Sequence, residues 1–160
     1  MVYYCYLLSP LGPMEISGDD DFVSRIQFVG EMKADTDRLP RVILDCKQQM
    51  EEYFAGTRKE FSLKLSQSGT DFQRQVWTEL YSIPYGKTTS YLKMARNIGD
   101  VNAIRAVGAA NGKNNLAIVV PCHRVIGSNG TLVGYAGGMD KKKWLLDFES
   151  QMTGQQKLDL

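Results

Sequence analysis

The chain has 160 residues, of which 43% are hydrophobic and 23% charged, and its formal net charge is +1. These values are typical of a globular protein with one or two small domains, and no apolar run suggests a membrane span or a signal peptide. The three cysteines are an odd number at wide spacings, which argues against a disulfide framework, and the single histidine leaves too few ligands for a structural zinc site. We therefore expect a cytoplasmic protein, nuclear in a cell that has a nucleus, with no metal site and no membrane partner.

Charge is distributed unevenly along the chain. Residues 1–70 carry 8 basic and 11 acidic side chains, whereas residues 71–160 carry 11 basic and 7 acidic ones. The mildly basic second part permits a polyanionic partner, although a difference of this size does not require one.

The first third of the chain predicts strands and one helix. β-prone and alternating segments indicate three strands, then a helix and a further strand, over residues 3–8, 14–17, 22–28, 42–54 and 61–65. Alternation in the third strand places Phe22, Ser24, Ile26 and Phe28 on one face. The segment Gln67-Ser68-Gly69 is typical of a linker, so we expect one domain over residues 1–66 and a second over 67–160.

Two cues define the predicted helix in this first domain. Apolar residues recur at helical spacing, and the stripe consists of Val42, Cys46, Met50, Tyr53 and Phe54. Gly56 is a plausible stop after the last turn. Cys46 lies on the apolar stripe, so we interpret it as a core residue.

From Thr70 the pattern becomes helical. Thr70 with Gln73 three residues later forms a capping box, and Pro84 ends this helix. A second helix is expected from Ser90 to Gly99, and a third from Asp100 through Asn111. Two short helices joined by a glycine turn are typical of a DNA-binding helix-turn-helix, although the same pattern also occurs in packed helix pairs without that function. Arg105 lies one residue off the Ile104/Val107/Gly108 stripe and is expected to point outward.

The segment Pro121-Cys122-His123-Arg124-Val125 carries the clearest chemical signal. It follows the apolar run 116–120, which predicts a buried strand ended by a proline that cannot donate to the ladder. A free thiol is mostly protonated near neutral pH, and a nearby imidazole and guanidinium would lower its pKa and supply a base. The alternative is that Cys122 is a small core hydrophobe, and the spacing alone does not decide between the two.

The last part of the chain predicts a loop and a helix. The glycine-rich segment 134–138 lacks the context of a dinucleotide-binding loop and is interpreted as a lid. Asp140 can cap a final helix whose apolar residues are Trp144, Leu145, Phe148 and Met152. Glu149 lies at the edge of this stripe, where it is either a solvated glutamate or a buried carboxylate with a partner.

Taken in order, these elements resemble one family, the methylated-DNA–protein-cysteine methyltransferases. The resemblance covers about residues 50–150, and its matching segments are EYFAGTRKEF, GTDFQRQVW, IPYGKTTSY, AIRAVGAAN, VVPCHRV, GYAGG and KKKWLL, followed by Glu149. It implies an α/β plus α fold, with an N-terminal ribonuclease-H-like α/β domain followed by a helical domain that contains a helix-turn-helix. It also implies direct repair of 6-O-alkylguanine in double-stranded DNA, and of 4-O-methylthymine, by a monomer that needs no cofactor.

The resemblance further implies roles for individual residues. Cys122 would accept the alkyl group and keep it, His123 would relay the thiol proton through a water, and Glu149 would orient His123. Asn114 would brace the site, and Tyr91 would donate a hydrogen bond to the departing base. The remaining assignments are the substrate-binding residues Tyr135, Val125, Ala136 and Gly137, and the DNA-binding residues Arg105, Tyr91, Gln73, Arg124 and Ser128.

The chain departs from the family pattern at two positions. Asn115 replaces a frequent proline, and Ala136 replaces a common serine, which removes one possible hydrogen bond to the alkylated oxygen. Two other functions stay open at this point: a DNA-binding regulator that uses only the helix-turn-helix, and a thiol hydrolase with a Cys–His–Glu set. The hydrolase does not explain Arg105 or the helix-turn-helix.

Overall fold

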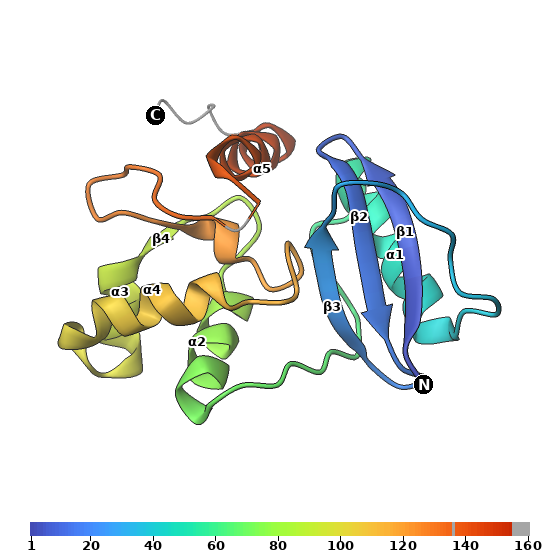
Figure 1. Cartoon of the computed structure of the whole chain (residues 1–160). Helices are drawn as coiled ribbons and strands as arrows, with labels where there is room; N and C mark the ends of the chain where they lie inside the picture. The colour runs from blue at the N-terminus through green and yellow to red at the C-terminus, as the bar shows by residue number, and fades with distance from the viewer. Residues whose placement is uncertain (136, 155–160) are drawn as a thin grey trace. The chain divides into compact units, whose positions relative to one another are not determined.

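The computed structural model describes residues 1–135 and 137–154 and divides them into two compact units (Figure 1). The first unit contains Met1–Gln67 together with Asn115–Ala117, and the second contains the other described residues. Ala136, one of the residues expected to bind the substrate, lies outside the described residues.

The first unit is built on a three-stranded antiparallel sheet. Its strands are β1 (Tyr3–Ser9), β2 (Gly12–Gly18) and β3 (Val23–Phe28), in the order β1-β2-β3. Helix α1 (Arg41–Phe54) packs against one face of this sheet (Figure 1). The predicted strands and helix are therefore present, with bounds that differ by a residue or two.

The predicted face of β3 is wrong. A β-bulge places Ser17 opposite Arg25 and Gly18 opposite Val23, so Ser24 is an extra residue without a partner on β2. The bulge shifts the alternation by one residue, because side chains on a strand have a period of two. Val23 and Ile26 are consequently both buried, whereas Phe22 is exposed.

Helix α1 confirms the expectation for Cys46. Its buried residues are Ile43, Cys46, Met50 and Tyr53, and Gly56 follows the helix after the cap residue Ala55. Burial raises the pKa of the Cys46 thiol to about 12 and that of Cys5, on β1, to about 11. Both cysteines are therefore protonated core residues without the properties of a nucleophile.

Two predicted strands are absent. Residues 61–65 form no regular strand and make one isolated bridge, between Leu65 and Val23. In the apolar run 116–120, Leu116 bridges Ile26 and the chain then turns. Ile118 has a φ of 72°, a left-handed conformation that a β-branched residue rarely adopts. The run 116–120 is apolar because most of its side chains are buried, whereas the apolar residues of 61–65 alternate with exposed polar ones and are half-buried.

The second unit is mainly helical. Its helices are α2 (Asp71–Tyr81), α3 (Tyr91–Ile98), α4 (Ile104–Gly112) and α5 (Met139–Met152), with short 3₁₀ turns η1 (Val101–Ala103) and η2 (Cys122–Arg124). Strand β4 (Thr89–Ser90) pairs in parallel with β5 (Val125–Ile126). This pairing matters for the site, because β4 leads directly into α3 and β5 directly follows η2.

The predicted helix boundaries in the second unit follow their capping residues. Thr70 and Gln73 form the capping box of α2, and Ser90 caps α3. Gly99 ends α3 with a φ of 100°, and Asp100 caps the following 3₁₀ turn. Helices α3 and α4 pack together after this turn, as expected for a helix-turn-helix.

Three details of the second unit differ from the prediction. Ile104 is exposed, so the buried stripe of α4 begins at Val107. Gly138, with a φ of 98°, is the N-cap of α5, and Asp140 lies within the first turn without capping the helix. Met152 is also exposed, because it lies at the end of α5 beyond the packed face.

The described residues contain no helix long and apolar enough to cross a membrane. Within the same ranges, no group of three or more His, Cys, Asp or Glu side chains is placed to hold a metal ion.

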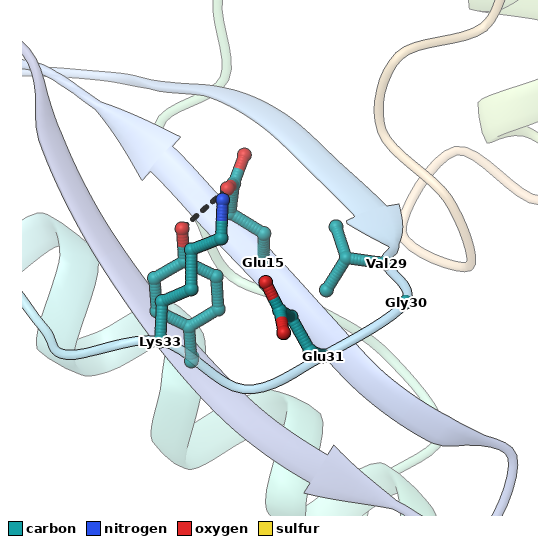
Figure 2. A pocket seen from close by; sticks show the side chains of 6 residues that line it. Glu15, Val29, Gly30, Glu31 and Lys33 are labelled. Atoms are coloured by element: carbon teal, nitrogen blue, oxygen red, sulfur yellow. Dashed lines mark hydrogen bonds between the residues drawn. The ribbon is translucent and has the colours of Figure 1, made fainter.

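The first unit has an open depression of about 420 Å³, which Figure 2 shows from close by. It is lined by Tyr6, Glu15, Val29, Gly30, Glu31 and Lys33. The Glu15 carboxylate accepts hydrogen bonds from Tyr6 Oη at 2.6 Å and from Gln27 Nε2 at 3.1 Å. All six lining residues belong to the first unit, and none of them is a predicted site residue.

Candidate active site

Cys122 is the first residue of η2 and is 7% exposed. Its backbone N–H donates to the Val120 carbonyl at 2.8 Å, which closes a tight turn around Pro121. The next strand, β5, is held beside β4, so the turn with the cysteine and the start of α3 are tied together. The fold thereby brings Cys122 near Tyr91, and Cys122 raises the pKa of the Tyr91 phenol.

The two residues that follow Cys122, His123 and Arg124, form a buried polar cluster with Glu149 of α5. His123 Nε2 is 2.7 Å from Glu149 Oε2, and the two side chains are 0% and 1% exposed. The Arg124 guanidinium donates to both oxygens of Glu149, at 2.8 and 3.0 Å, and to the Ile83 carbonyl. The Gly86 backbone N–H also donates to Glu149 Oε1, at 3.1 Å. Glu149 is therefore a buried, hydrogen-bonded carboxylate, which excludes the solvated alternative.

The charges of this cluster follow from opposing effects. Burial would raise the pKa of Glu149, but the interactions with His123 and Arg124 outweigh it and hold the pKa well below its usual range. Burial lowers the pKa of His123, against the effect of Glu149. We conclude that Glu149 is ionised with Arg124 as its ionic partner and that His123 is neutral at pH 7.

A neutral His123 has a defined tautomer. An ionised carboxylate only accepts hydrogen bonds, so Nε2 carries the ring proton and donates it to Glu149. Nδ1 is then an acceptor, and it is buried with no hydrogen-bond partner among the described residues. A buried lone pair on an imidazole, adjacent in the chain to a thiol, has the properties of a general base.

The Cys122 thiol itself is not pre-ionised by its neighbour in sequence. Burial raises its pKa, while a hydrogen bond from the Asn114 side chain and the charge of Lys142 act in the opposite direction. The expectation that the adjacent guanidinium lowers this pKa is wrong, because Arg124 is bound to Glu149. The thiol consequently needs a base when it reacts.

Asn114 lies just after α4 and braces the turn with the cysteine. Its Nδ2 donates to the Val120 carbonyl at 2.8 Å, two residues before Cys122. The same side chain is the first of the groups that oppose the effect of burial on the thiol. Its position agrees with the bracing role expected for it.

Lys142, on α5, is a residue that the sequence reasoning missed. It is fully buried, and its Nζ donates to the carbonyls of Val125, Val133 and Gly134 at 2.6, 2.8 and 3.2 Å. Burial lowers its pKa to about 8, against the effect of Cys122. Helical spacing could have identified it, because residues 142, 145 and 149 share one face of α5.

Tyr91 and Tyr135 complete the surroundings of the thiol. Tyr91 Oη donates to the Val133 carbonyl at 3.3 Å, and burial raises its pKa, with a further contribution from Cys122. Burial also raises the pKa of Tyr135 well above its usual value, again with a contribution from Cys122. Val125 is buried in β5, and Gly137 is half-buried beside the N-cap of α5.

The residues expected to contact DNA fall into two groups. Arg105 on α4 is exposed as predicted, Ser128 is exposed, and Gln73 is half-buried in the capping box of α2. Arg124 is different: it is buried, and its guanidinium is bound to Glu149 and Ile83. The expectation that Arg124 contacts DNA is therefore not retained, because a guanidinium held in this way does not reach a phosphate.

Comparison with protein families covers almost the whole chain. The ribonuclease-like domain of 6-O-methylguanine DNA methyltransferase matches residues 2–67, and the DNA-binding domain of the same family matches residues 71–151. The second match contains every residue of the cluster around Cys122.

Individual relatives agree with the family match. The methylated-DNA–protein-cysteine methyltransferase of Methanosarcina acetivorans is 44% identical over 153 residues, which is 92% of this chain and 98% of the relative. The constitutive enzyme of that name from Bacillus subtilis is 44% identical over 159 residues, covering 93% of this chain and 96% of its own length.

Solved structures show the same similarity. The 6-O-methylguanine methyltransferase of Mycobacterium tuberculosis has a TM-score of 0.85 and 41% identity, covering 95% of this chain and 94% of that one. A second structure of the M. tuberculosis protein, in complex with DNA, has the same TM-score and covers 93% of both chains. With family matches over both domains and an active-site cluster inside the second, this chain belongs to the methylated-DNA–protein-cysteine methyltransferase family.

Proposed function

We propose that this chain repairs DNA directly, by moving the alkyl group of 6-O-alkylguanine, and of 4-O-methylthymine, in double-stranded DNA onto its own Cys122. The observation that carries the proposal is the hydrogen bond between a neutral His123, next to Cys122 in the chain, and the buried, ionised Glu149. All of these groups come from one chain, which supports action as a monomer.

The transfer begins with the thiol. Because burial keeps Cys122 protonated at rest, its proton must leave as the sulfur attacks, and His123 Nδ1 is the acceptor, reached through a bridging water. Glu149 accepts from Nε2 and stabilises the imidazolium that forms, while Arg124 keeps Glu149 ionised.

Bond formation and bond breaking balance in a single displacement. A sulfur electron pair forms the new S–C bond to the alkyl carbon, and the electrons of the broken C–O bond stay on the guanine. Unmodified guanine has one more ring hydrogen than its 6-O-alkyl form, and the proton that left the sulfur supplies it. The product thioether has no proton to lose and is a poor leaving group, so each molecule reacts once.

The DNA must be distorted for this reaction to occur. The alkylated oxygen lies inside the duplex, and extruding the base costs about a few kcal/mol. Arg105 points outward from α4 and would occupy the vacated position in the stack, where it also finds phosphates nearby. Gln73 and Ser128 would contact the DNA backbone, which needs no sequence preference.

The extruded base requires a pocket beside Cys122. Tyr135 would form one wall, and backbone groups of Val125, Ala136 and Gly137 would contact the guanine. Tyr91 would donate a hydrogen bond to the departing base, which is an anion until it is protonated. Lys142 supports this pocket, because it binds carbonyls at both ends of the segment from Val125 to Gly134.

Stoichiometry tests this proposal. A fixed amount of protein is mixed with increasing amounts of duplex DNA that contains 6-O-methylguanine, and the restored guanine is measured. We expect repair to stop when it equals the amount of protein, and Cys122→Ser to bind the DNA without repairing it. Continued turnover, or full activity of Cys122→Ser, would contradict the proposal; the second result would favour a DNA-binding regulator.

A further inference from the structure

Asn111 is a buried amide next to Tyr91 that the mechanism above does not use. It lies near the end of α4 and is 5% exposed. Its Nδ2 is 3.4 Å from Tyr91 Oη, which is in turn 3.3 Å from the Val133 carbonyl. The phenol therefore lies between a side-chain amide and a backbone carbonyl.

The direction of these hydrogen bonds follows from what each group can do. A carbonyl only accepts, so the single hydroxyl proton of Tyr91 points to Val133. The Asn111 atom that faces the phenol oxygen must then be a donor, which fixes the orientation of the amide with Nδ2 toward Tyr91. Asn111 thus donates a hydrogen bond to a lone pair of the phenol oxygen, and the hydroxyl proton of Tyr91 stays available to an acceptor.

The length of both bonds is informative. At 3.3 and 3.4 Å they are longer than the usual range for such hydrogen bonds, so the phenol is held in place without being committed to Val133. Hydrogen bonds at catalytic sites are often long without substrate and shorten when it binds. The proton of Tyr91 can therefore turn from the Val133 carbonyl to an incoming base.

Stability alone does not account for an amide at this position. Asn111 Oδ1 is buried and has no hydrogen-bond partner among the described residues. A buried acceptor without a partner costs free energy, and an apolar side chain of similar size would avoid this cost. The side-chain hydrogen bond of Asn111 is therefore the one that Nδ2 donates to Tyr91.

We propose that Asn111 is a positioning residue for alkyl transfer, which holds Tyr91 so that its hydroxyl donates to the departing guanine. This inference rests on the proposed function and extends it to a residue outside the Cys–His–Glu set. As the C–O bond breaks, negative charge develops on the guanine ring, and the Tyr91 O–H hydrogen-bonds to it. Donation from Asn111 makes that hydroxyl a stronger donor, because it stabilises negative charge on the phenol oxygen. In agreement, burial raises the pKa of Tyr91, as does Cys122 when it is ionised, and the hydrogen bond from Asn111 opposes them.

A double-mutant cycle tests the proposal. Single-turnover rates are measured at saturating 6-O-methylguanine duplex for wild type, Asn111→Leu, Tyr91→Phe and the double variant. We expect Asn111→Leu to slow transfer about tenfold, which corresponds to about 1.4 kcal/mol, with unchanged DNA affinity. In the Tyr91→Phe background, the same substitution should have no further effect, because there is no hydroxyl left to position.

Two further readouts separate positioning from a merely structural role. The reaction of Cys122 with iodoacetamide has no departing base, so its rate should be unchanged in Asn111→Leu. The melting temperature should be equal to or above that of wild type, because the orphan acceptor is removed. Asn97→Leu is the matched control: Asn97 also donates through Nδ2 at 3.4 Å, but to Glu79, and its loss should leave the transfer rate unchanged.

Each outcome decides a different point. The role of Asn111 is overturned if Asn111→Leu transfers at the wild-type rate. It is also overturned if the substitution slows transfer equally in the Tyr91→Phe background. In both cases transfer by the wild type still upholds the proposed function. A slower iodoacetamide reaction with a lower melting temperature indicates structural damage and also overturns it. If Asn111→Leu does not fold, Asn111→Ala replaces it with the same expected slowing. If the wild-type protein does not transfer the methyl group, the proposed function itself is wrong.

Discussion

Cys46 in the first unit and Cys122 in the second are both shielded from water, but their neighbours differ. Cys46 lies on the apolar face of α1, where burial raises its pKa to about 12 and the nearby Cys5 acts in the same direction. Burial raises the pKa of Cys122 as well, but Asn114 and Lys142 oppose it, and the lone pair of His123 is adjacent. Polar groups arranged around a thiol, and not its exposure, therefore distinguish a reactive cysteine from a core residue.

The largest expected effect comes from exchanging the two sulfurs for oxygen. Cys122→Ser should abolish alkyl transfer, because a serine hydroxyl is a far weaker nucleophile than a thiol activated by His123. Cys46→Ser should keep transfer at the wild-type rate in the folded fraction while lowering stability, because it buries a hydroxyl in an apolar core. Loss of transfer in a folded Cys46→Ser variant would show that the two cysteines do not differ as described.

The buried ion pair of Glu149 and Arg124 provides a second comparison, with a half-exposed pair in the first unit. Glu149 and Arg124 are 1% and 6% exposed, whereas Glu52 and Arg58, also 2.8 Å apart, are 34% and 29% exposed. Glu149→Gln should cost about 3–5 kcal/mol in the free energy of unfolding, because it leaves the Arg124 charge buried without a counter-ion. Glu52→Gln should cost about 1 kcal/mol or less. Denaturant titration measures both, and equal costs would contradict the assigned role of burial.

The pH dependence of stability sharpens the same comparison. Burial lowers the pKa of His123 in the folded state, so below its unfolded value of 6.5 the unfolded chain binds a proton that the folded chain does not. Stability should therefore fall as pH decreases below 6.5, by about 1.4 kcal/mol per pH unit. Glu149, whose folded pKa is depressed, adds to this loss when pH falls below its unfolded value of 4.5.

A single variant isolates the histidine contribution. His123 is the only histidine in the chain, so His123→Gln should flatten the stability curve between pH 7 and pH 5.5. Unfolding curves at several pH values in this interval provide the measurement. A slope that survives in His123→Gln would assign it to another group and would contradict a neutral, buried His123.

The smallest expected effect concerns two neighbouring lysines on α5. Lys142 is buried and its charge lowers the pKa of Cys122, whereas Lys143 is 40% exposed and pairs with Asp147. Lys142→Met should shift the pH profile of Cys122 alkylation by iodoacetamide to higher pH, and Lys143→Met should leave it unchanged. Equal profiles for the two variants would show that the Lys142 charge does not act on the thiol.

Local patterns were sufficient for part of this site. Cys122 and His123 are adjacent in the chain, and the helical phase of α5 places Glu149 at the edge of the buried face. The sheet, α1 and the capped helices α2 and α3 were also predictable, because caps and periodicity are encoded within a few residues. The family resemblance then supplied the roles of these residues.

The remaining features depend on tertiary contacts that periodicity does not encode. The sequence shows Arg124 beside the cysteine, but not the buried carboxylate that binds its guanidinium. The hydrogen bond between Asn111 and Tyr91 could not be predicted either, because it forms only when α4 packs beside α3. The run 116–120 is apolar like a strand, yet it turns at Ile118, because it leaves the bridge with Ile26 and must reach Pro121.

The decisive measurement is the distribution of the transferred alkyl group over the three cysteines. The protein is incubated with an excess of duplex DNA that contains 6-O-methylguanine, digested, and analysed by peptide mass spectrometry. We expect one added methyl group on the peptide that contains Cys122 and none on those that contain Cys5 or Cys46. An unmodified Cys122, or modification of Cys5 or Cys46 to a similar extent, would contradict it.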